Sequence, residues 1–112
     1  MIRNRNLVYL CSFGDSDKNI SLALLAITSI LSYGSNFDLL LCTDQKSKIK
    51  ICNLIGDESN KIIFWIKDYN FQNMIDTTWT RYNIFNWEKV DHYKNLLYLD
   101  TDIIVRKNLN FI

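Results

Sequence analysis

Short apolar runs alternate with longer amphipathic ones along this chain, and this alternation predicts its secondary structure. Continuous apolar runs bounded by turn residues are typical of buried strands. They predict strands at Leu7–Ser12, Phe37–Thr43, Lys61–Ile66 and Leu96–Leu99, with a short extension at Ile103–Val105. The longer runs predict three helices, at Ile20–Tyr33, from Lys46 to Ile55, and from Thr77 or Thr78 to about Trp87.

Polar and glycine residues at the ends of these runs indicate where the helices begin and end. Asp17 or Asn19 could cap the first helix, which is expected to end at Gly34. Asp44 is placed to cap the second helix, and Gly56 to end it.

Alternating strands and helices predict βαβ units and a parallel sheet. The strands are continuously apolar, which favours a sheet covered on both faces. We therefore expect one α/β domain over residues 1–112, a Rossmann-like three-layer sandwich with a mostly parallel sheet. Ligands of such sheets bind at the carboxyl ends of the strands. Acidic clusters that suit a cation follow those ends, at Ser12–Asp17, Thr43–Asp44, Asp68 and Asp100–Asp102.

Composition and charge narrow the function classes. The net charge is +1, from 13 Lys and Arg against 12 Asp and Glu, so no basic field drives nucleic-acid binding. The absence of Pro and the three Gly exclude a linker or a loop-rich scaffold. Three cysteines without a CxxC pair argue against a zinc site or a disulfide framework. Cys11 and Cys42 are interpreted as buried free thiols, consistent with a reducing compartment.

No segment is predicted to target or anchor the chain to a membrane. The longest apolar stretch, Ile20–Tyr33, has 14 residues, whereas a membrane span needs about 20. The apolar run Leu7–Phe13 follows Arg3 and Arg5, but no small-residue cleavage site comes after it. We expect a cytoplasmic protein.

The segment around Asp100 and Asp102 has the clearest chemical signature. These carboxylates are two residues apart and directly follow an apolar strand. In extended backbone both would point to one side, with Thr101 opposite. Two adjacent anions destabilise a fold unless something neutralises them. Mg²⁺ or Mn²⁺ would do so, because these ions prefer hard oxygen ligands and retain positions for phosphate oxygens. A solvated acidic turn is the alternative.

This segment resembles a known family. Leu97–Val105, followed by Lys107-Asn108-Leu109, looks like the DxD region of retaining nucleotide-sugar glycosyltransferases of the GT-A fold. The likeness is greatest to the family that includes galactosyltransferases of bacterial lipopolysaccharide synthesis and glycogenin. In that family an Arg lies on a helix shortly before the motif, and Arg81 precedes Asp100 by 19 residues. The first strand and the apolar helix after it also match the family's beginning.

The resemblance implies transfer of a hexose from a nucleotide-diphosphate sugar, usually a UDP-sugar, to a hydroxyl of a carbohydrate or glycosylated-protein acceptor. Asp100 and Asp102 would hold Mn²⁺ or Mg²⁺. The implied donor-binding residues are Ser12 and Phe13 for the nucleoside, Arg81 for the diphosphate, and Thr101 within the motif. The family commonly has an acidic or Asn-containing stretch where Ser12 and Phe13 stand. Asp15 and Asp17 could compensate for that difference.

The resemblance covers only the donor-binding half of a GT-A domain, so the chain looks truncated after the DxD strand. The sequence ends 10 residues after Asp102. In the family the acceptor site and a metal-binding His come later. His92 precedes the motif and is interpreted as a surface residue, so no catalytic residue beyond the metal site is expected. A second copy or a complementing chain could complete the site.

Two other functions compete with the transferase interpretation. A haloacid-dehalogenase-like phosphatase has a similar DxDx(T/V) motif, but Ile104 stands where its Thr or Val belongs. The second alternative is an inactive remnant or interaction module of the same fold. Three Trp, six Tyr and six Phe are many for a core of this size, and some could form a partner face. The candidates for that face are Trp65, Tyr69, Trp79 and Trp87.

Overall fold

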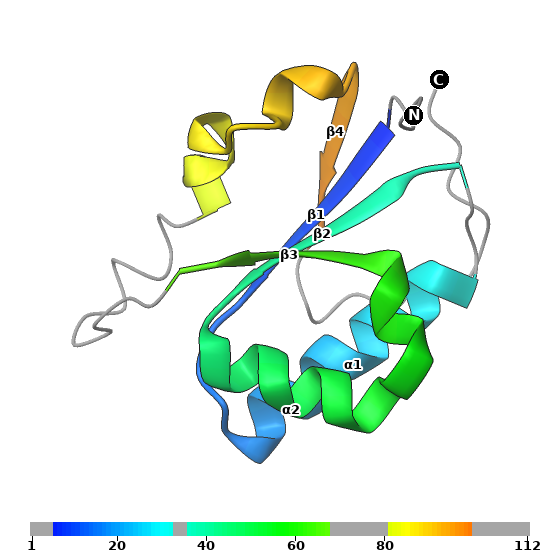
Figure 1. Ribbon diagram of the computed structural model, residues 1–112, viewed down its shortest axis with the longest axis vertical. Coiled ribbons are helices and arrows are strands. Elements are labelled where there is room, and N and C mark those ends of the chain that lie inside the picture. The colour runs from blue at the N-terminus through cyan, green and yellow to red at the C-terminus, as the bar shows by residue number, and fades with distance from the viewer. Residues whose placement is uncertain (1–5, 33–35, 68–80, 100–112) are drawn as a thin grey trace.

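A computed structural model describes residues 6–32, 36–67 and 81–99 of the chain. The strands are β1 (Asn6–Ser12), β2 (Asp38–Thr43), β3 (Ile62–Ile66) and β4 (Asn95–Tyr98). The α-helices are α1 (Asp17–Ser32) and α2 (Gln45–Ile55), and the 3₁₀ helices are η1 (Gly56–Lys61), η2 (Arg81–Asn86) and η3 (Val90–His92). The strands form one sheet in the order β3-β2-β1-β4 (Figure 1).

Every strand pair in this sheet is parallel, as the βαβ pattern predicts. β1 pairs with β2 from Leu7 opposite Asp38 to Ser12 opposite Thr43, and β2 pairs with β3 on its other side. β4 pairs with the first half of β1, from Asn6 opposite Asn95 to Tyr9 opposite Tyr98. The chain thus runs outward from β1 to β3 and then returns to the far side of β1. The strand order reverses between β1 and β4.

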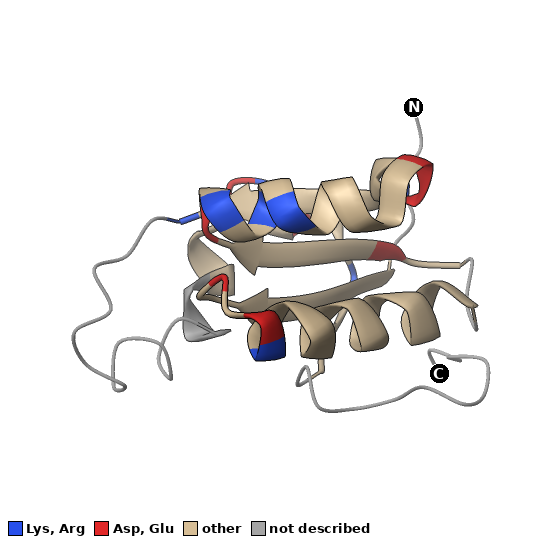
Figure 2. Ribbon diagram, turned by 90° about the horizontal axis from the view of Figure 1, so that it is seen from below, with Lys and Arg blue, Asp and Glu red and all other residues tan. Residues whose placement is uncertain are grey.

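The helices α1 and α2 lie side by side on one face of the sheet (Figure 2). They pack on alternate residues of the strands, which is the side-chain period of extended backbone. Buried positions of this core come from all of these elements: Val8, Leu10, Ile20, Ala23, Ala26, Ile27, Ile30, Leu39, Leu41, Ile51 and Ile62. α1 carries no charged residue after Lys18, in keeping with a helix that packs on the sheet.

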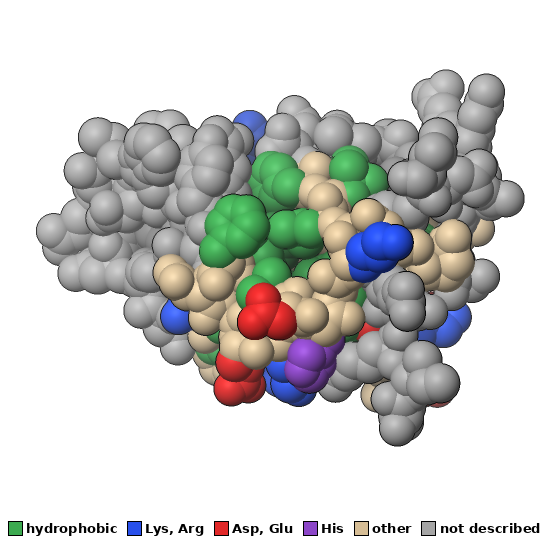
Figure 3. Space-filling model, turned by 90° about the horizontal axis from the view of Figure 1, so that it is seen from above, with side chains coloured by type: hydrophobic (Ala, Val, Ile, Leu, Met, Phe, Trp, Pro, Cys, Tyr) green, Lys and Arg blue, Asp and Glu red, His purple; other side chains and the backbone are tan. Residues whose placement is uncertain are grey.

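The other face of the sheet is covered by η2 and η3 (Figure 1). Its core is built on the intervening strand positions Leu7, Tyr9, Leu40 and Cys42, against Ile84 and Trp87. The Trp87 ring stacks on Tyr93, with centroids 6.0 Å apart and planes inclined by 17°. Figure 3 looks onto this face and shows hydrophobic side chains gathered in its middle. In the described part of the chain, α-helices cover one face of the parallel sheet and 3₁₀ segments cover the other, which is compatible with a Rossmann-like fold.

The prediction of an α-helix ending near Trp87 is wrong for the described part of that segment. Residues 81–86 form the 3₁₀ helix η2 instead. Its sequence, RYNIFN, contains β-branched, aromatic and Asn residues, all of which favour the α-helix weakly. This short segment nevertheless buries Ile84 on the sheet, and Trp87, directly after it, is buried there as well.

The other predicted elements are confirmed within a few residues at their ends. Asp44 caps α2, and Gly56 ends it with φ +63°, a value that favours glycine. α1 begins earlier than predicted, and its cap is neither Asp17 nor Asn19. The Ser16 hydroxyl accepts the Asn19 N–H at 3.2 Å and therefore caps the helix. Gly34 and Ile103–Val105 lie outside the described residues.

None of the helices in the described ranges has the length and apolar character that a bilayer crossing requires.

Candidate functional site

The carboxyl ends of β1 and β4 mark the point where the strand order reverses. In parallel α/β sheets, ligands bind in the crevice outside such a point, because neighbouring connections leave the sheet to opposite faces. The Leu99 N–H donates to the Tyr9 carbonyl at 3.1 Å, which ties the end of β4 to the middle of β1. Asp100 follows Leu99 directly in the sequence. Asp68, Asp100, Thr101 and Asp102 lie outside the described residues.

Of the two residues expected at the nucleoside, only Phe13 lies on the aromatic face of the sheet. Phe13 is partly buried and packs against the cluster that contains Tyr9, Ile84 and Trp87. Ser12 is 8% exposed, and strand alternation directs it to the helix-covered face. Ser12 is therefore poorly placed for ligand contact. Arg81 begins η2 on the same side as Phe13, but its side chain is outside the described structure.

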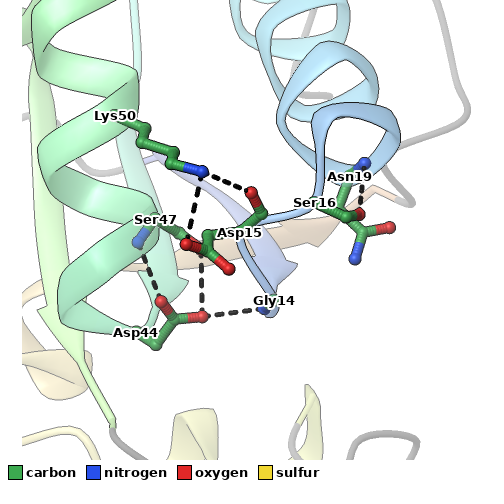
Figure 4. A network of polar contacts seen from close by, with 7 residues as sticks. All are labelled: Gly14, Asp15, Ser16, Asn19, Asp44, Ser47 and Lys50. Carbon is green, nitrogen blue, oxygen red and sulfur yellow. Dashed lines mark hydrogen bonds and ion pairs between the residues drawn. The ribbon is translucent and has the colours of Figure 1, made fainter.

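A polar network joins the loop after β1 to the beginning of α2 (Figure 4). Asp44 accepts the Ser47 N–H through Oδ1 at 2.8 Å. Its Oδ2 accepts the Gly14 N–H at 2.8 Å and the Ser47 hydroxyl at 3.0 Å. Gly14 has φ +88°, a backbone conformation that strains any residue with a Cβ, and a Cβ there would lie 2.9 Å from the side-chain Nδ2 of Asn19. The network holds the β1–α1 loop at the carboxyl edge of the sheet.

These hydrogen bonds change the acidity of Asp44. Burial on its own would raise the pKa of the carboxyl group. Backbone hydrogen bonds from Ser47 and Gly14, with the Ser47 hydroxyl, outweigh burial and lower the pKa of Asp44. Asp44 is therefore an anion bound by protein donors at neutral pH, and it is not a free ligand for a cation.

The acidic residues of the β1–α1 loop are also unsuited to binding a cation together. The Asp15 carboxylate lies 3.3 Å from Lys50 Nζ, which also donates to the Asp15 carbonyl at 2.9 Å. Asp17 is exposed in the first turn of α1. Within residues 6–32, 36–67 and 81–99, no three His, Cys, Asp or Glu side chains gather as a metal site. Of the described acidic residues at the strand ends, Asp44 and Asp15 are thus held by protein donors, and Asp17 is exposed.

Sequence reasoning identified Asp44 as a helix cap but missed its role as a clamp. Ser47 and Gly14 carried a local signal, since Ser three residues after a cap and a loop glycine are common. Their meeting through one carboxylate depends on β1 and β2 being neighbours, which the local sequence does not show. His92 is exposed in η3, and its interpretation as a surface residue is confirmed.

Thr43, at the end of β2, offers a test of this edge of the sheet. Its side chain is fully buried, and its hydroxyl has no hydrogen-bond partner among the described residues. A buried hydroxyl without a partner opposes folding, and valine fits a strand equally well. We expect Thr43→Val to leave the free energy of unfolding unchanged or raise it by up to about 1 kcal/mol. Urea denaturation measures this, and a clear loss of stability would show that the hydroxyl has a partner.

Comparisons with known proteins find neither a matching protein-family model nor a similar curated protein.

Proposed function

We propose that the chain binds a nucleotide-diphosphate sugar through a divalent metal ion, as the donor-binding part of a GT-A glycosyltransferase. The observation that supports this most strongly is the sheet order. It puts the reversal point between β1 and β4, and in the sequence Asp100-Thr101-Asp102 follows β4 after one residue, Leu99. Carboxylates at that point of a parallel sheet are suited to a metal-bound diphosphate.

The chemistry of the residues proposed to bind the metal ion and the diphosphate agrees with this assignment. Asp100 and Asp102 supply hard oxygen ligands, which Mn²⁺ and Mg²⁺ prefer. When bound, such an ion acts as a Lewis acid that stabilises negative charge on the departing nucleotide. Arg81 begins the segment that covers the same face as Phe13, and a guanidinium has the fork geometry that suits phosphate oxygens. The proposed reaction is transfer of a hexose to an acceptor hydroxyl with retention at the anomeric carbon.

Two described carboxylates near this edge of the sheet, Asp44 and Asp15, are engaged by protein donors. Asp44 accepts three hydrogen bonds from Gly14 and Ser47, and Asp15 pairs with Lys50. A cation at either residue would have to displace a donor that the fold itself provides. Asp100 and Asp102 follow β4 in the sequence, and we propose this pair as the ligands.

Calorimetric titration with UDP, with and without Mn²⁺, tests the proposal. We expect binding that requires Mn²⁺ and that Asp102→Asn weakens about tenfold or more, because even supporting residues of metal sites contribute this much. Asp57→Asn is the matched control, since Asp57 is exposed in η1, before the amino end of β3. Its affinity should equal that of the unmodified chain. Equal affinities in Asp102→Asn and the unmodified chain would overturn the metal assignment.

A second candidate is an inactive relative of this fold that serves as an interaction module. Phe85 favours it, because this large apolar side chain of η2 is 72% exposed. Exposed apolar groups of this size promote association when they belong to a larger patch. A folded chain that binds no nucleotide with or without Mn²⁺ would favour this candidate over the transferase.

A further inference from the structure

Two cysteines that lie far apart in the sequence are neighbours in the sheet. Cys11 on β1 is the register partner of Cys42 on β2, so both side chains point to the aromatic face. Adjacent strands are about 4.8 Å apart. A disulfide accommodates Cα atoms about 4.4–6.8 Å apart. All three cysteines of the chain are free thiols in the structure.

The phenol of Tyr9 lies close to these two cysteines. The Cys11 thiol donates to the Tyr9 hydroxyl at 2.8 Å. Tyr9 is buried two residues before Cys11 on β1. The centroid of its ring lies 5.7 Å from that of the Tyr98 ring. The three polar groups thus share a mostly apolar environment near the carboxyl end of β1. Cys42 is fully buried, whereas Cys11 is only half-buried and therefore reachable from solvent.

The electrostatic environment differs from that of an inert core cysteine. Hydrogen bonding with Cys11 lowers the pKa of Cys42 against the opposing effect of burial, and Tyr9 and the positive charge of Lys67 lower it further. Burial raises the pKa of Tyr9, and the neighbouring thiols Cys11 and Cys42 raise it further, so the phenol stays protonated. Lys67 Nζ lies 4.9 Å from the centre of the Trp65 ring, on the strand beside Cys42.

We propose that Cys11 and Cys42 form a redox-active dithiol that a small disulfide, such as oxidised glutathione, converts to an intramolecular disulfide. The reachable Cys11 thiolate, once its proton has left to solvent, attacks one sulfur of the small disulfide. A mixed disulfide forms, and the first reduced thiol leaves. The Cys42 thiolate then attacks the Cys11 sulfur, and the second reduced thiol leaves. Two electrons pass from the protein to the small disulfide.

The position of this bond gives it consequences for the candidate site. It would link β1 to β2 one register position before the pair Ser12 and Thr43. The hydrogen bond from Gly14 to Asp44 lies just beyond that pair. The β1–α1 loop begins after Ser12, the residue that follows Cys11. The inference stands on the geometry of the two strands and does not depend on the proposed nucleotide binding.

Intact-protein mass spectrometry and thiol titration test the dithiol. Cys52→Ser removes the remaining cysteine, which lies on α2, and serves as the background. After incubation with oxidised glutathione, we expect this variant to lose both titratable thiols and about 2 Da, the mass of two hydrogens, and dithiothreitol should reverse the change. Circular dichroism of the same sample confirms that the chain is folded.

Single substitutions in the same background separate the two steps. With Cys42→Ser, the reaction should stop at a glutathione adduct on Cys11. With Cys11→Ser, the buried Cys42 should react at least about tenfold more slowly. The double variant Cys11→Ser/Cys42→Ser, which retains Cys52, is the control and should form no intramolecular disulfide. A folded Cys52→Ser chain that keeps both thiols free, or that retains an unresolved adduct, would overturn the proposal.

Discussion

Replacing Trp87 by Ala is expected to lower the free energy of unfolding by about 3–5 kcal/mol, the range for removing a buried large aromatic side chain. Trp87 is 6% exposed and packs on Tyr93 and on Trp65, whose ring centroid is 6.4 Å away. The substitution would leave the sheet face above Tyr9 and Cys42 without its principal cover. Urea denaturation followed by far-ultraviolet circular dichroism measures the loss.

The matched control for this prediction is Phe85→Ala. Phe85 is close in the sequence and similar in chemistry, but it is 72% exposed. Its removal should change stability by no more than about 0.5 kcal/mol, as for other surface substitutions. Trp87→Phe retains an aromatic ring and should lose less than Trp87→Ala. If Phe85→Ala and Trp87→Ala lowered the free energy of unfolding equally, residues 81–93 would not be packed on this face of the sheet.

The second large effect is expected for Asp44→Ala, which should lower the free energy of unfolding by about 2 kcal/mol. The substitution removes the cap of α2 and leaves the Gly14 N–H without its acceptor. Asp44→Asn keeps an amide oxygen for the Ser47 N–H but loses the second acceptor, so its loss should be intermediate. Comparison of the two variants separates the helix cap from the clamp on the β1–α1 loop.

The pH dependence of stability gives an independent test of Asp44. Its pKa is lower in the folded chain than in the unfolded chain, so its contribution is fully present above the unfolded pKa. As the pH falls toward and through the folded pKa, this contribution is lost. Denaturation at neutral and at acid pH should therefore show a smaller acid-induced loss for Asp44→Ala than for the unmodified chain. Parallel pH profiles for the two chains would contradict the assigned hydrogen bonds.

The candidate site was only partly predictable from the sequence. The carboxylate pair at Asp100 and Asp102 is visible there, because two acidic residues after an apolar strand form a local pattern. Ser12 was expected at the nucleoside from its position at the end of the first strand, yet strand alternation directs its side chain to the helix-covered face. Asp44 and Gly14 are 30 residues apart in the sequence, so no local pattern near either residue predicts their contact.

The sequence by itself determined the strands, the two α-helices and the cap residues of α2, because these depend on neighbours within a few positions. The spacing of hydrophobic residues was sufficient to predict the strands and helices, and Asp44 and Gly56 marked the ends of α2. Only the tertiary structure decided the strand order, the pairing of Cys11 with Cys42, and the 3₁₀ segment that covers the aromatic face. Each of these depends on burial shared between residues far apart in the chain, and packing of that kind overrides local preference.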